Sequence, residues 1–371
     1  MDVLAPPAEA GDLTAGAPLK HKNLFDLLRL IAATMVLCSH AFSLTGRPAP
    51  GCLGNALGTL GVKIFFVISG LMITRSWLAD PRLWPFATRR ALRIMPALIL
   101  VVLVTTFLMG PVATVLPLSE YFHDHATWFY LRNILLFPVY FLPGVFRDNV
   151  YPSAVNGSLW SLPAEVCMYV LTPLVIWRQP AQARLAIGIV AALFTVCGLY
   201  CVRITPLHPV PVVYGTSLVS LLDVAAYFQV GAIFAVFGLE RLGRPVFSLL
   251  LLLVCGVFVR HVGATNNIGV LAEILLWLTL PYAVVSVGSV RLHGKLARLL
   301  AQPDISYGMY LYGFPIEQLI SAAFHGQISP WGEFALALPL TGLCGALSWV
   351  TVEKAALRLK PSRRGANWKA A

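Results

Sequence analysis

The chain alternates between long apolar stretches and short polar connections. A helix needs about 17 to 25 mainly apolar residues to cross a bilayer, and ten stretches have or approach that length. They cover residues 24–44, 60–79, 94–110, 160–177, 185–202, 217–238, 245–260, 268–290, 303–324 and 334–353. This pattern predicts an all-α integral membrane protein with about ten transmembrane helices.

The two ends of the chain differ from this apolar body. Residues 1–21 are rich in Ala, Pro and Gly and have no basic segment ahead of an apolar run. We therefore expect a disordered cytoplasmic tail and no signal peptide. Residues 22–356 make up the predicted transmembrane domain, and residues 357–371 a basic cytoplasmic tail.

One connection, residues 111–159, is much longer than the others. It contains the stretch ATWFYLRNILLFPVYFL, which is apolar and aromatic but is broken by Arg132, Asn133 and Pro138. Such a stretch favours an interfacial or re-entrant helix over a full span. It either floors a substrate pocket or packs at the bilayer surface.

Basic residues predict the orientation of the chain. If the N-terminus is cytoplasmic, nineteen of the 27 Lys and Arg fall in inner loops and tails, and five fall in outer loops. Inner connections of membrane proteins are enriched in Lys and Arg. The asymmetry therefore predicts that both termini are cytoplasmic and that Cys52 and the 111–159 connection face outward.

Composition agrees with a protein whose solvent is a bilayer. The chain is 58% hydrophobic and 12% charged, with a mean hydropathy of +0.77, whereas soluble domains carry about 25% charged residues. The net charge of +11 comes mostly from the inner connections. No basic run is interleaved with aromatic residues, so we expect no nucleic-acid partner.

Two patterns that resemble metal sites do not support one. The seven cysteines show no paired-CxxC spacing and no disulfide framework. His123, Asp124 and His125 are adjacent in a connection, and adjacent residues seldom converge on one ion. We therefore expect no metal site.

The first apolar stretch carries two ionisable residues, Arg29 and His40. Eleven residues at about 100° each bring them to nearly the same face of a helix, about 16 Å apart along its axis. Ionisable groups in hydrocarbon are costly and usually have a function. The pair predicts a substrate path along this helix. The alternative is an arginine that reaches the interface and a packed polar histidine.

The fourth stretch begins with NGSLWSLPAEVCMYVL. Pro163 suits the first turn of a helix and Ser161 suits its cap, which places Glu165 in the first turn on the outer side. His40 lies about one turn from the outer end of its own helix, so the two side chains can share a depth and pair. A carboxylate can orient and charge an imidazole that acts as a base. Alternatively, Glu165 only complements the helix dipole.

Arginines gather where the third stretch begins, in ATRRALRIMPALIL. Arg89, Arg90 and Arg93 lie at the inner end of this helix, beside Arg82 and near the level of Arg29. They are either a positive-inside anchor or a site for phosphate groups, which guanidinium groups bind through paired hydrogen bonds. A phosphate site would receive an anionic, nucleotide-bearing donor from the cytosol.

Five motifs in order resemble the bacterial integral-membrane acyltransferase-3 family, over about residues 22–360. FDLLRLIAATMVLCSH resembles the family's Arg–ten residues–His pattern, and GVKIFFVISGLMI its Gly-x-x-x-Phe-Phe-x-x-Ser-Gly signature. RRALRIMPA resembles the basic segment before the third span, NGSLWSLPAEVCMYVL the Ser-Leu-Trp-Ser-Leu-x-x-Glu motif, and DISYGMYLYGFPIEQLI the Ser-Tyr-x-x-Tyr-Leu segment. The residues of these motifs that we expect to support the site are Asp26, Phe66, Ser69, Trp160 and Tyr310.

The resemblance implies an enzyme that moves an acyl group, usually acetyl from acetyl-CoA, to a hydroxyl of a carbohydrate across a bacterial inner membrane. It implies that Arg29, Arg90 and Arg93 bind the acyl-CoA. His40 and Glu165 would be catalytic, with His40 as a base or as a transient acyl carrier. Acyl-CoA is then a donor substrate, and no permanently bound cofactor is implied. The implied acceptor is an extracytoplasmic or lipid-linked glycan such as exopolysaccharide or O-antigen; the oligomeric state stays open.

The ninth stretch departs from the family pattern. Many members have His after Tyr-Leu-Trp/Tyr, where this chain has Gly313 followed by Phe314 and Pro315. A branch of the family shares this difference, so we interpret it as a subgroup trait. The alternative function is a membrane transporter of a small solute or glycan precursor, which would move its substrate without consuming acyl-CoA. Many transporters show internal repeats, and none is evident here.

Overall fold

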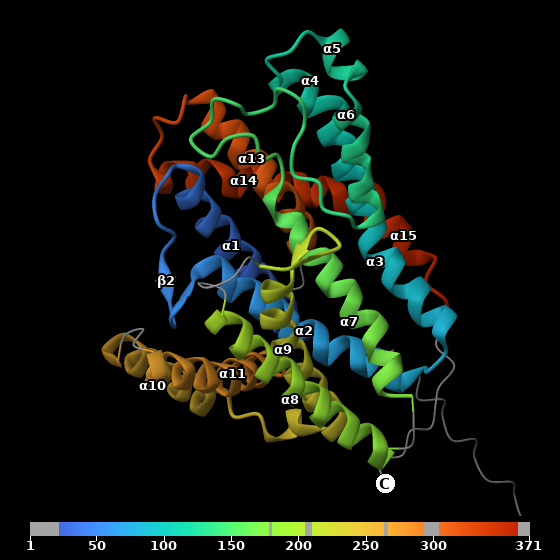
Figure 1. The fold of residues 1–371 in the computed structure, drawn as a ribbon. Coiled ribbons are helices and arrows are strands. Elements are labelled where there is room, and N and C mark those ends of the chain that lie inside the picture. Colours follow the sequence, from blue (N-terminus) through green and yellow to red (C-terminus); the bar gives the residue numbers. More distant parts are fainter. Residues whose placement is uncertain (1–21, 178–179, 205–209, 263–265, 293–303, 363–371) are drawn as a thin grey trace, which may run out of the picture.

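The computed structural model describes residues 22–177, 180–204, 210–262, 266–292 and 304–362 (Figure 1). Helices lie in all ten stretches that the hydrophobic pattern predicts, which confirms the all-α class. They are α1 (Phe25–Leu44), α2 (Leu57–Ala79), α3 (Leu83–Val104), α7 (Ser161–Val175), α8 (Pro180–Ile204), α9 (Leu218–Phe237), α10 (Pro245–Val262), α11 (Asn266–Gly288), α13 (Ser306–Ala323) and α14 (Pro330–Ser348).

Strands in the described ranges are two residues long, and each pair connects two neighbouring segments of the chain. β1 (Lys22–Asn23) pairs with β6 (Arg291–Leu292) and ties the start of α1 to the end of α11. β2 (Gly51–Cys52) pairs with β3 (Asn55–Ala56), and β4 (Val212–Val213) with β5 (Thr216–Ser217). The last two pairs turn the chain into α2 and α9.

Eight of the described helices are long and apolar enough to cross a membrane, fewer than the ten that the sequence predicts. The two that fall short are α10, which is apolar but short, and α13. α13 contains Tyr310, Glu317 and Gln318, all buried. A helix enclosed by other helices does not contact lipid, so it can carry polar residues that a lipid-facing helix cannot.

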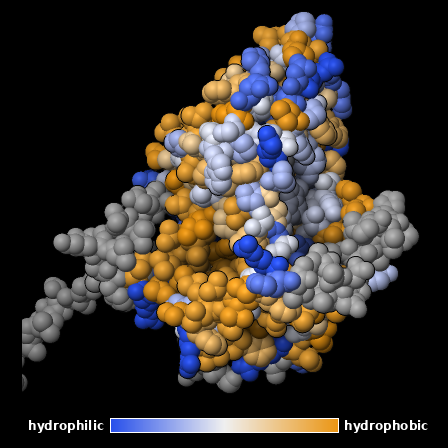
Figure 2. All heavy atoms as spheres, turned by 90° about the vertical axis from the view of Figure 1, so that its left-hand side faces the viewer, coloured by the Kyte–Doolittle hydropathy of each residue, from blue (hydrophilic) through white to orange (hydrophobic). Residues whose placement is uncertain are grey.

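A broad apolar surface surrounds this bundle. On the face shown in Figure 2, hydrophobic residues form a continuous band, and hydrophilic residues gather at the end of the molecule that carries α5 and α6 in Figure 1. Exposed leucines, valines and phenylalanines occur on α8, α10 and α14. In water such a surface would aggregate, so its extent agrees with a bilayer as solvent.

α2 is the most enclosed of the eight helices, with 72% of its apolar window buried. It meets α9 at two glycines. A Cβ on Gly70 would lie 2.0 Å from the carbonyl oxygen of Phe228, and a Cβ on Gly231 would lie 2.2 Å from that of Val67. Glycine therefore lets the two backbones approach closely, and this contact fixes the position of Ser69 beside Gly70.

α1 and α13 pack side by side and run in the same direction. Arg29 near the start of α1 meets Asp304 just before α13, and His40 near the end of α1 meets Glu317. We call the first level the arginine end of the bundle and the second level the histidine end. The two predicted site residues of α1 thus lie at opposite ends of one helix pair.

α3 begins eleven residues before the predicted stretch, so Arg89, Arg90 and Arg93 lie inside the helix rather than ahead of it. The sequence signal missed this start because basic residues lower the hydropathy there. Beyond α3 the helix continues through a π-helical turn, η1 (Thr105–Met109), into α4 (Gly110–Ala113). Tyr121 donates a 2.8 Å hydrogen bond to the Thr106 carbonyl oxygen in that turn.

Within the 111–159 connection, the stretch ATWFYLRNILLFPVYFL is helical only in its first part. This connection is built from short helices. It contains α5 (Leu118–His123), α6 (His125–Phe129) and the 3-10 helices η2 (Tyr130–Leu135) and η3 (Gly157–Trp160). Leu136 takes a left-handed conformation that ends η2. The Asn133 side chain bonds both the carbonyl oxygen and the amide of Val139, each at 2.9 Å, and so holds the turn that follows. These two side-chain hydrogen bonds hold the backbone in a turn and so prevent the helix from continuing.

The predicted tails fall mostly outside the described ranges. Residues 1–21 and 363–371 are not described. At the C-terminal side, α14 continues through η5 (Trp349–Glu353) into α15 (Lys354–Arg358). The helix therefore crosses the boundary expected at residue 356.

Candidate active site

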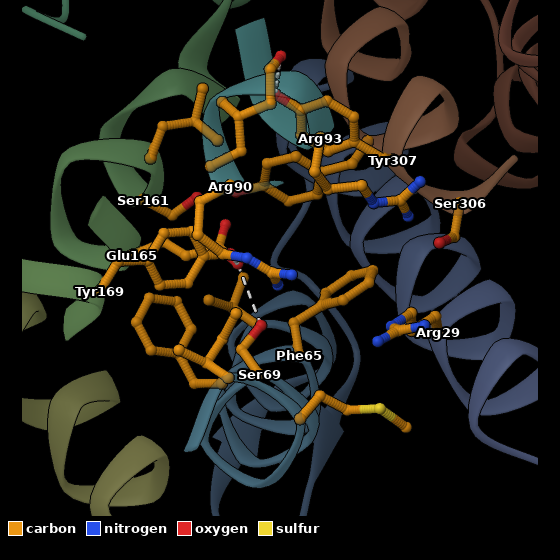
Figure 3. A pocket seen from close by; sticks show the side chains of 17 residues that line it. Arg29, Phe65, Ser69, Arg90, Arg93, Ser161, Glu165, Tyr169, Ser306 and Tyr307 are labelled. Atoms are coloured by element: carbon orange, nitrogen blue, oxygen red, sulfur yellow. Dashed lines mark hydrogen bonds between the residues drawn. The ribbon is translucent and has the colours of Figure 1, made fainter. Parts of the chain in front are cut away.

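A pocket at the arginine end brings together side chains from five helices (Figure 3). Its volume of about 780 Å³, which includes the opening to solvent, is in the range of small-molecule sites. Predicted site residues that line it are Arg29, Phe66, Ser69, Arg90, Arg93, Glu165 and Tyr310. The arginines predicted to bind the donor, the second-span signature and the fourth-span carboxylate therefore share one pocket.

Arg29 and Arg93 converge on one carboxylate. Asp304 lies 3.5 Å from Arg29 and forms a shorter ion pair with Arg93, and it also accepts a 3.2 Å hydrogen bond from the Ser306 amide. Arg29 is further paired with Asp26, at 2.9 Å, which places that motif residue at the rim of the pocket. Asp304 thus links the starts of α1 and α13 to α3.

Arg90 differs from its neighbours. Within the described ranges it has no carboxylate oxygen within 4.0 Å, whereas Arg29 and Arg93 both do. Figure 3 shows its guanidinium group directed into the centre of the pocket, between Ser69 and Arg93. A partly buried guanidinium that forms no direct ion pair is a strong binding group for a phosphate or carboxylate.

Arg89 and Arg82 serve the fold instead. Both pair with Asp80, with Arg89 at 2.8 Å and Arg82 at 2.6 Å and 3.0 Å to the two carboxylate oxygens. The hydrogen bond from Arg82, followed by that from Arg89, outweighs burial and lowers the pKa of Asp80 to about 2. Of the clustered arginines, these two are therefore an anchor of the α2–α3 turn.

Glu165 belongs to the arginine pocket, so the expected pair between His40 and Glu165 was wrong. Glu165 accepts hydrogen bonds from Ser69 at 3.0 Å and from Tyr169 at 2.5 Å. The reason is depth: α7 begins inside the bundle, not at its outer end. The hydroxyl of Tyr310 donates to the Ser158 carbonyl oxygen at 3.0 Å and lies 2.6 Å from the Ser161 hydroxyl.

His40 lies at the histidine end against α13. Its Nδ1 is 3.6 Å from a carboxylate oxygen of Glu317, and its ring packs edge-on against Phe314 with centroids 5.1 Å apart. Glu317 is fully buried, and 23% of the His40 side chain is exposed. Sequence reasoning missed Glu317 and Asp304, although an acid within an apolar stretch is the same signal that drew attention to Arg29 and His40.

Trp160 lies away from both groups. It lines a second, open pocket of about 980 Å³, a volume that includes the opening to solvent, together with Tyr140, Phe141 and Tyr151 of the long connection. Tyr151 contacts Phe314 with ring centroids 6.2 Å apart, and Phe314 in turn contacts His40. The long connection therefore does form a pocket wall, and one aromatic ring separates that wall from His40.

His123, Asp124 and His125 have local structural contacts. His123 Nδ1 lies 2.6 Å from the Ser119 carbonyl oxygen, and Asp124 accepts a 2.8 Å hydrogen bond from the Ala126 amide as the cap of α6. The His125 ring packs against Phe129. In the described part of the chain, no group of three or more His, Cys, Asp or Glu is placed to hold a metal ion.

Comparison with known proteins relates this architecture to a family. Residues 23–353 match the acyltransferase domain family. The chain is 28% identical to the O-acetyl transferase of Shigella phage Sf6 over 343 residues, which covers 90% of this chain and 96% of that protein. It is also 28% identical to Nodulation protein 10 of Rhizobium leguminosarum bv. viciae, over 92% of this chain and 95% of that protein.

A third relative is matched over a shorter region. The peptidoglycan O-acetyltransferase OatA of Listeria monocytogenes is 26% identical over 216 residues, which is 53% of this chain and 32% of that protein. No solved structure matches the chain. Because the family match spans nearly the whole bundle and both candidate groups, the chain belongs to the acyltransferase-3 family of multi-pass membrane proteins and is an acyltransferase.

Proposed function

We propose that this protein transfers an acetyl group from acetyl-CoA to a carbohydrate hydroxyl. The observation that carries the proposal is the placement of two chemically distinct groups on α1, the arginine pocket at Arg29 and the imidazole of His40. Two relatives, an O-acetyl transferase and a peptidoglycan O-acetyltransferase, support acetyl as the group and oxygen as the acceptor atom.

The arginine pocket is the proposed donor site. Arg90 has no carboxylate partner in the described ranges and would take a phosphate of coenzyme A, while Arg29 and Arg93 stand on either side of Asp304. Met72, Phe65 and Ile73 supply apolar lining for the pantetheine arm. Glu165 keeps the hydroxyls of Ser69 and Tyr169 oriented beside Arg90.

His40 is the proposed base. It takes the proton of the acceptor hydroxyl as the oxygen attacks the acetyl carbonyl carbon, so a C–O bond forms and the C–S bond of the thioester breaks. The proton then passes to the thiolate sulfur of coenzyme A, which leaves as the thiol. If His40 instead carries the acetyl group transiently, the same bonds change in two steps.

The aromatic cavity beside Phe314 is the proposed acceptor site. Tyr140, Phe141, Tyr151 and Trp160 offer flat apolar faces for a sugar ring, and Ser217 and Ser220 offer hydroxyls. The basic asymmetry of the sequence predicts that the arginine end is cytoplasmic and that this cavity faces outward. We accordingly propose a bacterial inner membrane as the location and an extracytoplasmic or lipid-linked glycan, such as exopolysaccharide or O-antigen, as the acceptor.

Mass spectrometry of envelope glycans from a deletion strain tests the proposal. We expect O-acetyl groups on one glycan to disappear and to return with the wild-type gene but not with His40→Ala. Unchanged O-acetylation of every envelope glycan in the deletion strain would overturn it. The transporter alternative gains no support from the described residues, and family membership favours the enzyme.

A further inference from the structure

Among the described residues, buried polar atoms without a hydrogen-bond partner gather at the histidine end. They are Nδ1 of His40, both carboxylate oxygens of Glu317 and of Glu333, and the hydroxyls of Ser321 and Thr341. α1, α13 and α14 contribute them, and these three helices pack together. Buried polar groups are normally hydrogen-bonded, so a group of unpaired ones within a protein interior calls for a functional reason.

The orientation of His40 within this group is specific. Nδ1 is buried and faces Glu317, whereas the exposed 23% of the side chain lies on the rest of the ring. The 3.6 Å between Nδ1 and the carboxylate is slightly longer than a hydrogen bond. Catalytic hydrogen bonds are often long before substrate binds and shorten in the reacting complex.

Glu317 has a second acid beside it. The ionisable side chains close enough to interact with Glu317 are His40 and Cys38 on α1 and Glu333 on α14. Glu317 and Glu333 are both fully buried. Two buried carboxyl groups in one region of a dry interior are not both ionised at low cost, so the charge of this region is small and His40 faces it directly.

We propose that Glu317 is the positioning residue of His40: its carboxylate holds the Nδ1–H tautomer, leaves Nε2 free for the acceptor hydroxyl and stabilises the imidazolium that forms. This inference rests on the proposed role of His40 as the base. It replaces the Glu165 pairing that the sequence suggested with a partner from the ninth helix.

Diethylpyrocarbonate modification of His40 tests the contact without any activity assay. The reagent acylates the neutral imidazole, so the rate of His40 modification against pH, followed by peptide mass spectrometry in detergent-solubilised full-length protein, reports the charge of the ring. We expect the pH of half-maximal rate to be about 1 to 3 units lower in Glu317→Gln than in wild type, because an adjacent carboxylate favours the charged ring. Glu317→Asp should fall between the two.

The matched control is Ser321→Ala, which alters a buried neighbour one helical turn away and should leave the midpoint unchanged. An equal midpoint in wild type and in both Glu317 variants overturns the inference. If Glu317→Gln does not insert, the comparison of Glu317→Asp with Ser321→Ala decides the question. If the Glu317 variants show no shift in midpoint while His40→Ala abolishes acetyl transfer, only the contact between Glu317 and His40 is rejected. If His40→Ala transfers acetyl at the wild-type rate, the role of His40 as the base is rejected.

A kinetic split separates positioning from folding. Glu317→Gln should reduce acetyl transfer by about 10²-fold or more, within the range of general-base help, while acetyl-CoA binding to the arginine pocket stays within about twofold of wild type. A structural defect would weaken both. Weakened donor binding in Glu317→Gln that matches its loss of transfer would contradict a positioning role.

Discussion

Ser69 on α2 donates a 3.0 Å hydrogen bond to Glu165 on α7. The bond joins the Phe-Phe-x-x-Ser-Gly signature to the Ser-Leu-Trp-Ser-Leu-x-x-Glu motif, two segments far apart in the chain. It exists because Gly70 lets α9 pack against α2 and because α7 begins deep in the bundle. Two motifs that lie on separate helices therefore form one wall of the arginine pocket.

Glu165→Gln should lower acetyl transfer about 10²-fold, since it removes the negative charge near Arg90 but keeps the shape of the side chain. Ser69→Ala removes one hydrogen bond to a charged group, worth about 1.5–3 kcal/mol, and should cost less. Initial rates of thiol release from acetyl-CoA in proteoliposomes measure both. A larger loss in Ser69→Ala than in Glu165→Gln would show that the Ser69 hydroxyl acts on the substrate directly.

Arg90→Ala should weaken acetyl-CoA binding about 10- to 100-fold, the loss of one or two charge-assisted hydrogen bonds. Its thermal stability should change little, since Arg90 has no carboxylate partner among the described residues. Equilibrium binding of radiolabelled acetyl-CoA to purified protein measures the effect. Arg147→Ala, in the long connection, is the control; unchanged affinity in Arg90→Ala would make the cluster a topological anchor alone.

His40→Ala should reduce transfer by at least 10²- to 10⁴-fold while insertion and donor binding persist. The exposed His261, whose Nδ1 lies 2.9 Å from the Val257 carbonyl oxygen, supplies the control His261→Ala and should be near neutral. Complementation of a deletion strain, scored by glycan O-acetyl content, compares the two at matched expression. Normal O-acetylation by His40→Ala protein would reject the proposed mechanism.

Asp80→Asn should destabilise the protein by about 3–5 kcal/mol, because it leaves the buried Arg89 without its carboxylate. The arginine partners of Asp80 lower its pKa from 3.8 to about 2. Its contribution to the free energy of unfolding is therefore complete above pH 3.8 and is lost as pH falls through about 2. The midpoint temperature of thermal unfolding in detergent should therefore fall more steeply between pH 5 and pH 2 for wild type than for Asp80→Asn. Parallel curves would contradict this assignment.

Cys52 should report the orientation of the chain. It is exposed at the end of β2, beyond the end of α1. With Cys52 as the only cysteine, we expect a membrane-impermeant thiol reagent to label it in intact cells whose outer barrier admits the reagent. Lys354→Cys in a Cys52→Ser background should react only after the cells are opened, and the reverse result would invert the proposed topology.

Hydrophobic periodicity was sufficient to locate the helices, because a lipid-facing helix must be apolar over a fixed length. Hydropathy gives no such information for helical residues that do not face lipid. It placed the start of α3 too late, since Arg89 and Arg90 interrupt the apolar run while the helix continues. It also counted α13 as an ordinary span, although Glu317 and Gln318 are enclosed by neighbouring helices.

The candidate site was predicted in part. Local pattern placed Arg29 and His40 on one helix, and the family motifs supplied Arg90, Arg93, Ser69 and Glu165, which the structure brings into one pocket with Arg29. The sequence did not indicate how deep in the bundle each helix begins. Nothing in the sequence near Glu165 indicates that Asn156 bonds the Leu311 carbonyl oxygen at 2.9 Å and so sets the start of α7 inside the bundle. Partners such as Asp304 and Glu317 come from tertiary packing.

The polar character of α13 bears on how the chain enters the membrane during synthesis. An acid at the centre of a helix costs about 2.5–3.5 kcal/mol during insertion, and α13 holds Glu317 beside Gln318. We therefore expect α13 to insert together with α14 as a hairpin, against α1 and α2 that are already in place. A nascent chain cut after Ala323 should leave α13 accessible to water-soluble reagents, so the histidine end would be the last part of the enzyme to mature.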